Sequence, residues 1–412
     1  MRGLPVLLTF ITTGIVIFHR IFSKNNINFS TESESILKPL PLFNKTLISN
    51  KFSCTESCRK NNGKKTPRFI DRKSLKADWQ PDYKLLDKWS AGGKARLNFF
   101  TDNLTAQNEN DLLTSAKTYV DDYWFGKRDV ELEIVTVFNQ QASDVLIQNF
   151  RVRENEIPEV YHYTWFNCRE FTFIHMASIL SVLRFMEPSA MILFHTDCTP
   201  NGVLWQNVVS LSQKRLKIVK IRPMKTVWDR RIKEIVHVSD IYRILVLYKF
   251  GGIYLDDDMV LLKSHSNWLI NQHVPVLAEE SQASVANGFM IAPAQSTIML
   301  RWLVEYKSYS SRNTIIGLNS VLKMWCLWQR YPKEINVVKG LMVRPNWKEK
   351  GMLFYGHFDW SKSYNVHLNQ RFVKPMLDSF EVSLSFDGID CLDTSFGEIL
   401  RFIFYERFEV CA

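Results

Sequence analysis

The chain has 412 residues and a formal net charge of +10, with 46% hydrophobic and 23% charged residues. These values are those of an ordinary globular chain, and they argue against a disordered or multi-span membrane protein. The length accommodates one large domain or two smaller ones. Much of the basic excess is local, because residues 51–76 contain nine Lys and Arg against two acidic residues. That segment lacks apolar periodicity, so we expect a solvated linker and no nucleic-acid partner.

The amino terminus carries an uncharged, mostly apolar run from Gly3 to Phe18, and Ile21 and Phe22 extend it. About 20 apolar residues are needed to cross the roughly 30 Å hydrocarbon core of a bilayer, so this run is near the lower limit. A cleaved signal peptide is the alternative, but the run ends in FHRIFS, without small residues at a cleavage site. We therefore expect an uncleaved signal anchor at residues 1–22.

Residues 23–78 are polar with scattered proline, which predicts a flexible basic stem. The basic residues on the two sides of the anchor are nearly balanced, so they do not decide its orientation. Glycosylation sequons begin at Asn28, Asn44 and Asn103. Because glycans are added in the lumen, these sequons favour a single-pass type II protein of the Golgi membrane with a lumenal body.

Aromatic and apolar residues return at residues 79–156, which we interpret as a packed N-terminal extension. It contains a predicted helix near Asp111–Tyr123 and an apolar run, Leu132–Phe138, suited to a strand. Seven cysteines are spread along the chain, and their pairing does not follow from the sequence.

From residue 157 to 412, short apolar runs alternate with amphipathic segments. The runs VYHYTW, MILFH and LKIVKI predict strands, and a helix is expected at about Phe171–Phe185 between the first two. This alternation is typical of βαβ units, so we predict an α/β domain built on a mostly parallel sheet. Nucleotides bind such sheets beyond the carboxyl ends of the strands, which makes Tyr163 and Trp165 candidate nucleotide or donor-sugar contacts.

The segment SDIYRILVLYKF has the apolar spacing of a helix, with Ser239 as its expected N-cap and Gly251-Gly252 as its end. Asp240 and Arg243 lie three residues apart on one edge of this helix. A salt bridge or a capping role would explain these two residues as well as a site would.

Three consecutive carboxylates, Asp256, Asp257 and Asp258, follow the predicted strand Ile253-Tyr254-Leu255. Adjacent anions at a strand end require a cation, and oxygen ligands suit a hard divalent ion such as Mn²⁺ or Mg²⁺. In an extended segment Asp256 and Asp258 would face one way and Asp257 the other. The alternative is an acidic surface turn, which the apolar residues on both sides argue against.

The run HVSDIYRILVLYKFGGIYLDDDMVLL resembles the core motif of the glycosyltransferases that have a DXD-containing sugar-binding region. That family includes alpha-1,4-galactosyltransferases and alpha-1,4-N-acetylglucosaminyltransferases. The similarity extends to IPEVYHYTW and HTDCTPNGVLW and covers roughly Ile157 to Arg371. A motif of this length is far more specific than a lone DXD.

The resemblance implies a GT-A fold, a Rossmann-like domain with a mostly parallel sheet flanked by helices. It also implies a nucleotide-sugar donor, a Mn²⁺ ion and retention of anomeric configuration. Carried over, Asp256 and Asp258 would be catalytic and would bind the metal with His367. The donor sugar and nucleotide would contact a second set of residues: Asp240, Arg243, Asp257 and Asn287. This chain has Asn369 where the family commonly has Trp, so His367 could also be an ordinary imidazole, and Asn287-Gly288 could be a simple tight turn.

These features together predict a metal-dependent hexosyltransferase that moves a hexose or N-acetylhexosamine from a UDP-linked donor to a glycan or glycolipid. No carboxylate nucleophile is evident, so front-face attack by the acceptor is the expected retaining mechanism. The alternative is a catalytically decayed lumenal glycan-binding protein, but Asp256 and Asp258 are both intact. A phosphohydrolase or kinase is a weaker alternative, because the chain has no G-x-x-x-x-G-K-[ST] run.

Overall fold

The computed structural model describes residues 105–125, 133–135, 157–186, 190–264, 272–281, 284–310, 317, 319–346 and 349–406. The predicted anchor, the predicted stem and the sequons at Asn28, Asn44 and Asn103 lie outside these residues. Among the described helices, none combines the length and the apolar character that a membrane crossing requires. The segment boundaries expected at residues 22, 78 and 156 therefore stay predictions.

An eight-stranded sheet forms the centre of the described chain, in the order β1-β4-β3-β2-β7-β10-β9-β11. Its second to fifth strands are parallel to one another: β4 (Leu216–Lys220), β3 (Met191–Thr196), β2 (Val160–Trp165) and β7 (Gly252–Leu255). At one edge, β1 (Glu133–Val135) pairs antiparallel with β4. On the other side of β7, β10 (Ser284–Ala292) is antiparallel to β7, and β9 (Val276–Ser281) is antiparallel to β10. Strand β11 (Asn336–Val338) forms the second edge and is parallel to β9. This confirms the predicted α/β class with a mostly parallel sheet.

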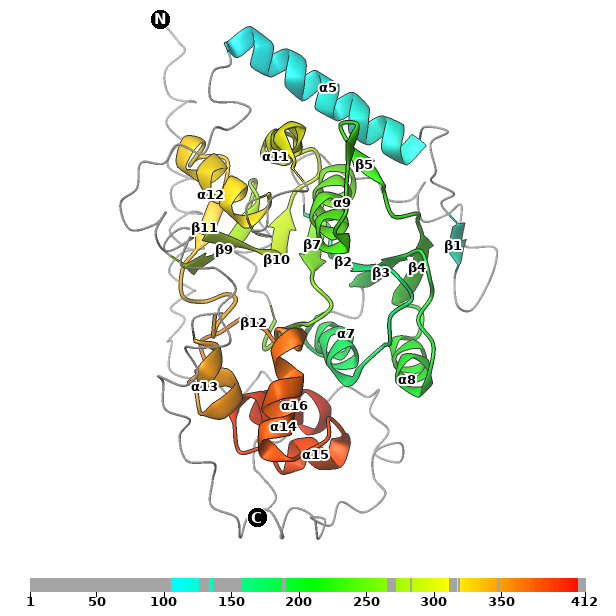
Figure 1. Cartoon of the computed structure of the whole chain (residues 1–412), viewed down its shortest axis with the longest axis vertical. Helices are drawn as coiled ribbons and strands as arrows, with labels where there is room; N and C mark the ends of the chain where they lie inside the picture. Colours follow the sequence, from blue (N-terminus) through cyan, green and yellow to red (C-terminus); the bar gives the residue numbers. More distant parts are fainter. Residues whose placement is uncertain are drawn as a thin grey trace, which may run out of the picture. The chain divides into compact units, whose positions relative to one another are not determined.

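Helices cover both faces of this sheet (Figure 1). One face carries α7 (Phe173–Phe185) and α8 (Val203–Ser212), and the other carries α9 (Ile235–Phe250), α11 (Thr297–Glu305) and α12 (Val321–Arg330). The chain runs from β2 outward through β3 to β4 and then returns to form β7 on the other side of β2. Because crossovers between parallel strands are right-handed, the helices on the path from β2 to β4 lie on one face, and α9, on the path to β7, lies on the other. The strand order thus reverses between β2 and β7.

Further elements complete the two helical layers. On the side of α9, α5 (Ala106–Phe125) packs against α11, and it contains the helix predicted at residues 111–123. On the side of α7, a group of four helices forms the C-terminal part: α13 (Lys350–Tyr355), α14 (Val373–Phe380), α15 (Phe386–Asp390) and α16 (Ser395–Tyr405). Helix α16 packs on α7, which explains why α7 is buried on nearly all sides.

A small second sheet joins the C-terminal part to the end of β7. It pairs β8 (Met259–Leu261) with β12 (Asn365–His367), antiparallel, with His367 opposite Met259. The short helix η5 (Gln370–Phe372) follows directly. Residues more than 100 positions downstream in the sequence are thereby brought against the Asp256–Asp258 segment.

The junction of α9 and β7 depends on two glycines. Gly251 has φ of 65° and Gly252 has φ of 100°, a region that side-chain-bearing residues rarely adopt. A Cβ on Gly252 would lie 2.5 Å from the Val160 carbonyl oxygen of β2. Glycine therefore allows β7 to approach β2 closely, and α9 ends at Phe250, directly before the predicted Gly251-Gly252 stop.

The start of α9 differs from the expectation. The helix begins at Ile235, with Glu234 as its cap residue, and Ser239 lies inside it. The Ser239 hydroxyl bonds Thr164 Oγ1 at 2.8 Å and Tyr254 Oη at 2.9 Å. Predicting Ser239 as the N-cap was wrong because its hydroxyl serves tertiary contacts to β2 and β7.

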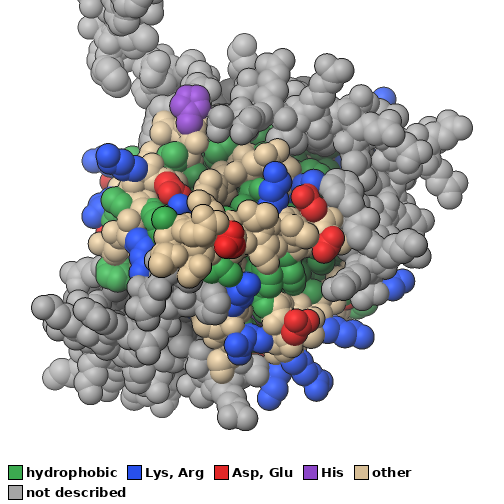
Figure 2. All heavy atoms as spheres, turned by 90° about the horizontal axis from the view of Figure 1, so that it is seen from above, with side chains coloured by type: hydrophobic (Ala, Val, Ile, Leu, Met, Phe, Trp, Pro, Cys, Tyr) green, Lys and Arg blue, Asp and Glu red, His purple; other side chains and the backbone are tan. Residues whose placement is uncertain are grey.

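Seen from above, the described surface carries Lys and Arg side chains interspersed with Asp and Glu (Figure 2). Hydrophobic side chains are visible among them in small groups. A mixed surface of this kind is typical of a solvated face.

Candidate donor site beyond the carboxyl ends of the strands

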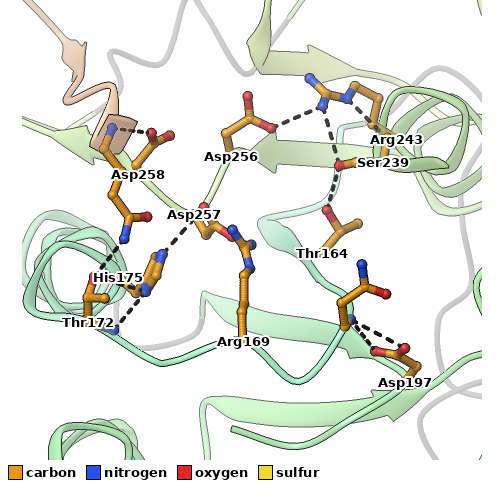
Figure 3. A network of polar contacts seen from close by, with 12 residues as sticks. Thr164, Arg169, Thr172, His175, Asp197, Ser239, Arg243, Asp256, Asp257 and Asp258 are labelled. Carbon is orange, nitrogen blue, oxygen red and sulfur yellow. Dashed lines mark hydrogen bonds and ion pairs between the residues drawn. The ribbon is translucent and has the colours of Figure 1, made fainter. Parts of the chain in front are cut away.

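The point between β2 and β7 is where ligands bind in open α/β sheets, just outside the carboxyl ends of the strands. The segment Asp256–Asp258 follows β7, and the loop 166–172 follows β2, so both border this point. Figure 3 shows the polar network that links them. The site is therefore built from segments that are distant in sequence but adjacent in the sheet.

Asp256 is held by the backbone and by two side chains. Its amide donates to the Gly288 carbonyl at 2.8 Å, and its Oδ1 accepts from Tyr254 Oη at 3.0 Å. The same oxygen lies 3.1 Å from Arg243 Nη2. A Cβ on Gly288 would stand 2.6 Å from Asp256 Oδ2, so a side chain there would displace the carboxylate. The Asp256 side chain remains 24% exposed and can still meet a ligand.

Arg243 lies at the centre of a buried cluster. Its Nη2 is 3.2 Å from Asp240 Oδ1, and its Nη1 donates to the Asn287 carbonyl. Asn287 in turn donates from Nδ2 to Asp240 Oδ1 at 2.8 Å. The structure thus brings Asp240, Arg243 and Asn287 together with Asp256, as an ion-paired cluster that forms one wall of the site.

Burial dominates the electrostatics of this cluster. It raises the pKa of Asp240, although the Arg243 charge acts in the opposite direction. For Arg243, burial lowers the pKa, but the nearby groups Asp256, Tyr254 and Asp240 together outweigh burial, and the net pKa is raised. Arg243 is therefore a permanent cation whose removal would leave two carboxylates without a counter-charge.

Asp258 contacts the C-terminal part of the chain. Its Oδ1 lies 2.8 Å from His367 Nε2, and its Oδ2 accepts from the Gln370 amide at 2.9 Å. Burial opposes ionisation of both groups, but their mutual attraction and hydrogen bond outweigh it. The pKa of His367 rises to about 9, and the pKa of Asp258 falls below its usual value. The two side chains therefore form an ion pair at neutral pH.

Glu280 on β9 belongs to the same neighbourhood, and sequence reasoning missed it. Burial raises its pKa, the charges of His367 and Arg371 lower it, and Asp256 raises it. Glu280 stands in no motif, so no local signal in the sequence could have identified it. Its place depends on the pairing of β9 with β10.

Asp257 points toward α7 and the loop after β2. It forms an ion pair with Arg169, and its Oδ1 lies 3.8 Å from His175 Nε2. Burial and the Arg169 charge lower the pKa of His175 to about 3, so this imidazole is neutral. Arg169 was not predicted as a site residue, because a single arginine in a loop has no distinguishing pattern.

The three carboxylates do not alternate as an extended strand would require. Strand β7 ends at Leu255, and the Met259 amide closes a turn by donating to the Asp256 carbonyl at 2.9 Å. In Figure 3, Asp256 points toward Arg243, and Asp257 points toward Arg169 and His175. Asp258 contacts none of these three residues and accepts from the Gln370 amide. The extended conformation expected for Asp256–Asp258 was wrong, because these residues form a turn and each carboxylate has its own partner.

Tyr163 and Trp165 do not face the site. Both side chains are fully buried, because β2 is a central strand covered on both faces. The Tyr163 hydroxyl donates to the Ser178 carbonyl at 3.3 Å. Trp165 packs against His175 and lies under the Arg169 guanidinium. The expected direct contact of these residues with nucleotide or sugar does not fit their burial.

The donor atoms at the site are of the kind that Mn²⁺ or Mg²⁺ would use. Carboxylate oxygens of Asp256 and Asp258 and the imidazole of His367 are suitable ligands for Mn²⁺. Within the described ranges, however, no group of three or more His, Cys, Asp or Glu side chains is arranged to hold a metal. Asp258 and His367 contact each other, and Asp256 contacts Arg243. The residue types fit a divalent ion, while their arrangement here is that of ion pairs.

Comparison with known proteins shows a match at this region. Residues 135–275 match the family described as "Glycosyltransferase sugar-binding region containing DXD motif". The chain is also 26% identical over 199 residues to "Glucan organizing enzyme 1" of Cryptococcus neoformans var. grubii serotype A. That alignment covers 44% of this chain and 52% of the relative, so the chain spans about half the length of the curated protein it matches.

Solved structures that resemble the chain include "PaToxG Glycosyltransferase", at 13% identity and a TM-score of 0.32, covering 71% of this chain and 95% of that chain. Another is the galactosyltransferase LgtC in complex with donor and acceptor sugar analogs, at 9% identity and a TM-score of 0.29, covering 57% of this chain and all of that chain, 100%. TM-scores of this size do not establish a shared fold. The family match and the curated relative confirm the predicted resemblance and agree with the predicted enzyme class.

Proposed function

We propose that this chain, which carries the DXD-containing sugar-binding region of glycosyltransferases at residues 135–275, is a retaining hexosyltransferase of the GT-A type. The donor is a UDP-linked hexose or N-acetylhexosamine, and the acceptor is a glycan or glycolipid. One observation carries the proposal: the turn Asp256–Asp258 meets the cluster of Asp240, Arg243 and Asn287 beyond the carboxyl end of β7.

The reaction breaks the bond between the anomeric carbon and the diphosphate, and the departing diphosphate gains negative charge. A divalent ion held by Asp256, Asp258 and His367 would neutralise that charge when bound. The protein itself fixes the Asp256 carboxylate through Arg243 and Tyr254, so the site is oriented before the donor arrives. Asp240 and Asn287 are hydrogen-bonded to each other in the cluster that holds Asp256, and they are the carboxylate and amide that we expect to contact sugar hydroxyls.

Retention of configuration follows from front-face attack, in which the acceptor hydroxyl approaches from the side on which the diphosphate leaves. The new bond joins the acceptor oxygen to the anomeric carbon, and the diphosphate takes the bonding electron pair. The acceptor proton passes to the departing phosphate oxygen, so charge and atoms balance.

The direct test is a panel of UDP- and GDP-sugars offered to the detergent-solubilised full chain with Mn²⁺. We expect slow hydrolysis of one UDP-sugar and faster transfer from it once an acceptor glycan is supplied. A chain that binds glycans but turns over no nucleotide sugar would instead be the decayed, glycan-binding alternative. The intact Asp256–Asp258 turn and its charge partners favour the enzyme.

The metal proposal predicts a pH dependence. Although burial lowers the pKa of His367, the adjacent Asp258 raises it to about 9, so below that pH a metal must displace a proton. Apparent Mn²⁺ affinity should therefore rise with pH between 6.5 and 8.5, by up to about tenfold per pH unit. Calorimetry in buffers of different ionisation enthalpy should detect release of a proton, and His367→Gln should abolish that release. An affinity that does not vary with pH would argue against His367 as a ligand.

The proposed location in the cell is the Golgi membrane, with residues 1–22 as a type II anchor and the remainder in the lumen. We expect glycans on one or more of Asn28, Asn44 and Asn103. Endoglycosidase treatment of the cellular protein should increase its mobility on a gel, and replacing all three Asn residues by Gln should abolish the shift. A carboxyl terminus accessible to protease in intact microsomes would contradict this topology.

A further inference from the structure

The loop after β2 is fixed in place beside the proposed donor site. A disulfide joins Cys168 in this loop to Cys198 in the loop after β3. The Asn167 amide also donates to the Asp197 carboxylate, at 3.2 Å to Oδ1. Two neighbouring strand-end loops are thereby tied together at the carboxyl edge of the sheet. The residue that follows Cys168 is Arg169.

Arg169 reaches back over the end of β2 toward the acidic turn. Its Cζ atom lies 4.2 Å from the centroid of the Trp165 ring, and its Nη2 pairs with the Asp257 carboxylate. Burial lowers the pKa of Arg169, whereas the charges of Asp258 and Asp256 raise it. Figure 3 shows it standing between Asp257 and the loop that carries it.

The two arginines of the site differ in what they can still bind. Arg243 has a side chain that is 5% exposed, and Asp240, Asp256 and Asn287 occupy its donors. Arg169 has a side chain that is 45% exposed. Within the described residues, its hydrogen bonding is limited to Nη2 and Asp257. A guanidinium has five N–H donors, so most of those of Arg169 have no partner among the described residues, and the exposure of the side chain leaves room for a ligand to reach them.

We propose that Arg169 contacts the diphosphate of the donor and stabilises the charge that develops on it as the sugar leaves. This inference rests on the proposed function and assigns a residue outside the family motif to the same site. The guanidinium fork matches phosphate oxygens bidentately, and stacking on Trp165 with pairing to Asp257 limits the conformations that it must lose on binding.

The disulfide and Asp197 act on Arg169 as positioning groups. They hold the loop so that the guanidinium stays over Trp165 when no donor is bound. Replacing both cysteines by serine should therefore weaken diphosphate binding in the same direction as loss of Arg169, but by less. The double variant is preferable to a reducing agent, because Cys391 is also disulfide-bonded.

The test measures binding of UDP and UMP to the full chain by calorimetry. In Arg169→Gln, UDP affinity should fall about tenfold or more, whereas UMP affinity should stay within about twofold of the parent. Arg169→Lys should recover part of the UDP affinity, because it restores the charge without the fork. The control is Lys225→Gln, which removes an exposed cation between β4 and β5 (Thr226–Val227) and should leave both affinities unchanged.

Three other outcomes would count against the inference. Equal UDP binding by Arg169→Gln and the parent would overturn it while leaving the proposed function intact. Equal losses of UDP and UMP affinity would show that Arg169 shapes the nucleotide pocket and does not contact the diphosphate. A parent chain that binds neither UDP nor GDP would contradict the proposed function itself. Asp257→Asn provides a second variant: it removes the ion-pair partner of Arg169 but leaves the guanidinium in place, so UDP affinity should fall by less than in Arg169→Gln, and an equal or larger loss would overturn the inference.

Discussion

Asp256→Asn and Asp258→Asn should each reduce sugar transfer by at least about 10²- to 10³-fold, the loss seen when one stabiliser of developing charge is removed. Asparagine keeps the shape of the side chain but removes its charge. Asp256→Asn would weaken the contact with Arg243, and Asp258→Asn would leave His367 without its ion-pair partner. Both changes also remove a proposed metal ligand.

The measurement is Mn²⁺-dependent donor hydrolysis and transfer, after thermal melting has shown that each variant is folded. Asp229→Asn is the matched control, because Asp229 is exposed in the turn before β6 (Arg230–Arg231). Asp257→Asn should reduce transfer less than the other two, since Asp257 pairs with Arg169 and not with Arg243 or His367. Folded Asp256→Asn and Asp258→Asn variants with parental activity would refute the proposed mechanism.

Arg243→Ala should both destabilise the protein and reduce its activity. From the sequence alone we would expect loss of transfer with nucleotide binding preserved, but the structure shows that Arg243 is a buried counter-charge. Removing one partner of a buried ion pair costs about 3–5 kcal/mol, because the remaining charge is left uncompensated. Here Asp240 and Asp256 would both lose their cation. Turnover should fall because the Asp256 carboxylate would no longer be held.

Chemical denaturation would measure the loss of unfolding free energy, with Arg231→Ala as a control on the exposed strand β6. A surface change of that kind is expected to stay within about 0.5 kcal/mol of the parent. Adding Asp240→Asn to Arg243→Ala should restore part of the stability, since it removes one of the uncompensated charges. Parental stability and turnover in Arg243→Ala would mean that the cluster is not needed.

The sequence alone was enough to predict the elements that carry the site. Alternation of apolar runs with amphipathic segments predicted the parallel strands β2, β3 and β4 and the helix α7. Gly251-Gly252 marked the end of α9 correctly, because positive φ is a local requirement that glycine meets. These features depend on neighbouring residues only, so periodicity and turn chemistry reveal them.

The tertiary structure decided where the side chains point. Arg169 is 88 residues from Asp257, and Gln370 is 112 residues from Asp258, so no local pattern could pair them. We expected Asp257 to face away from its neighbours because we assumed a strand, whereas these residues form a turn whose three carboxylates each pair with a side chain from a different, distant segment.

The burial of Trp165 and the position of Arg169 beside Asp257 also depend on the tertiary structure. A strand end in sequence says nothing about what covers the strand, and helix α7 with the loop after β2 covers this one. The residues of the motif could be identified from the sequence because they stand at the same spacing as in the family that the chain resembles. Their counter-charges could not, because ion pairing depends on which segments the fold brings within a few ångströms of one another.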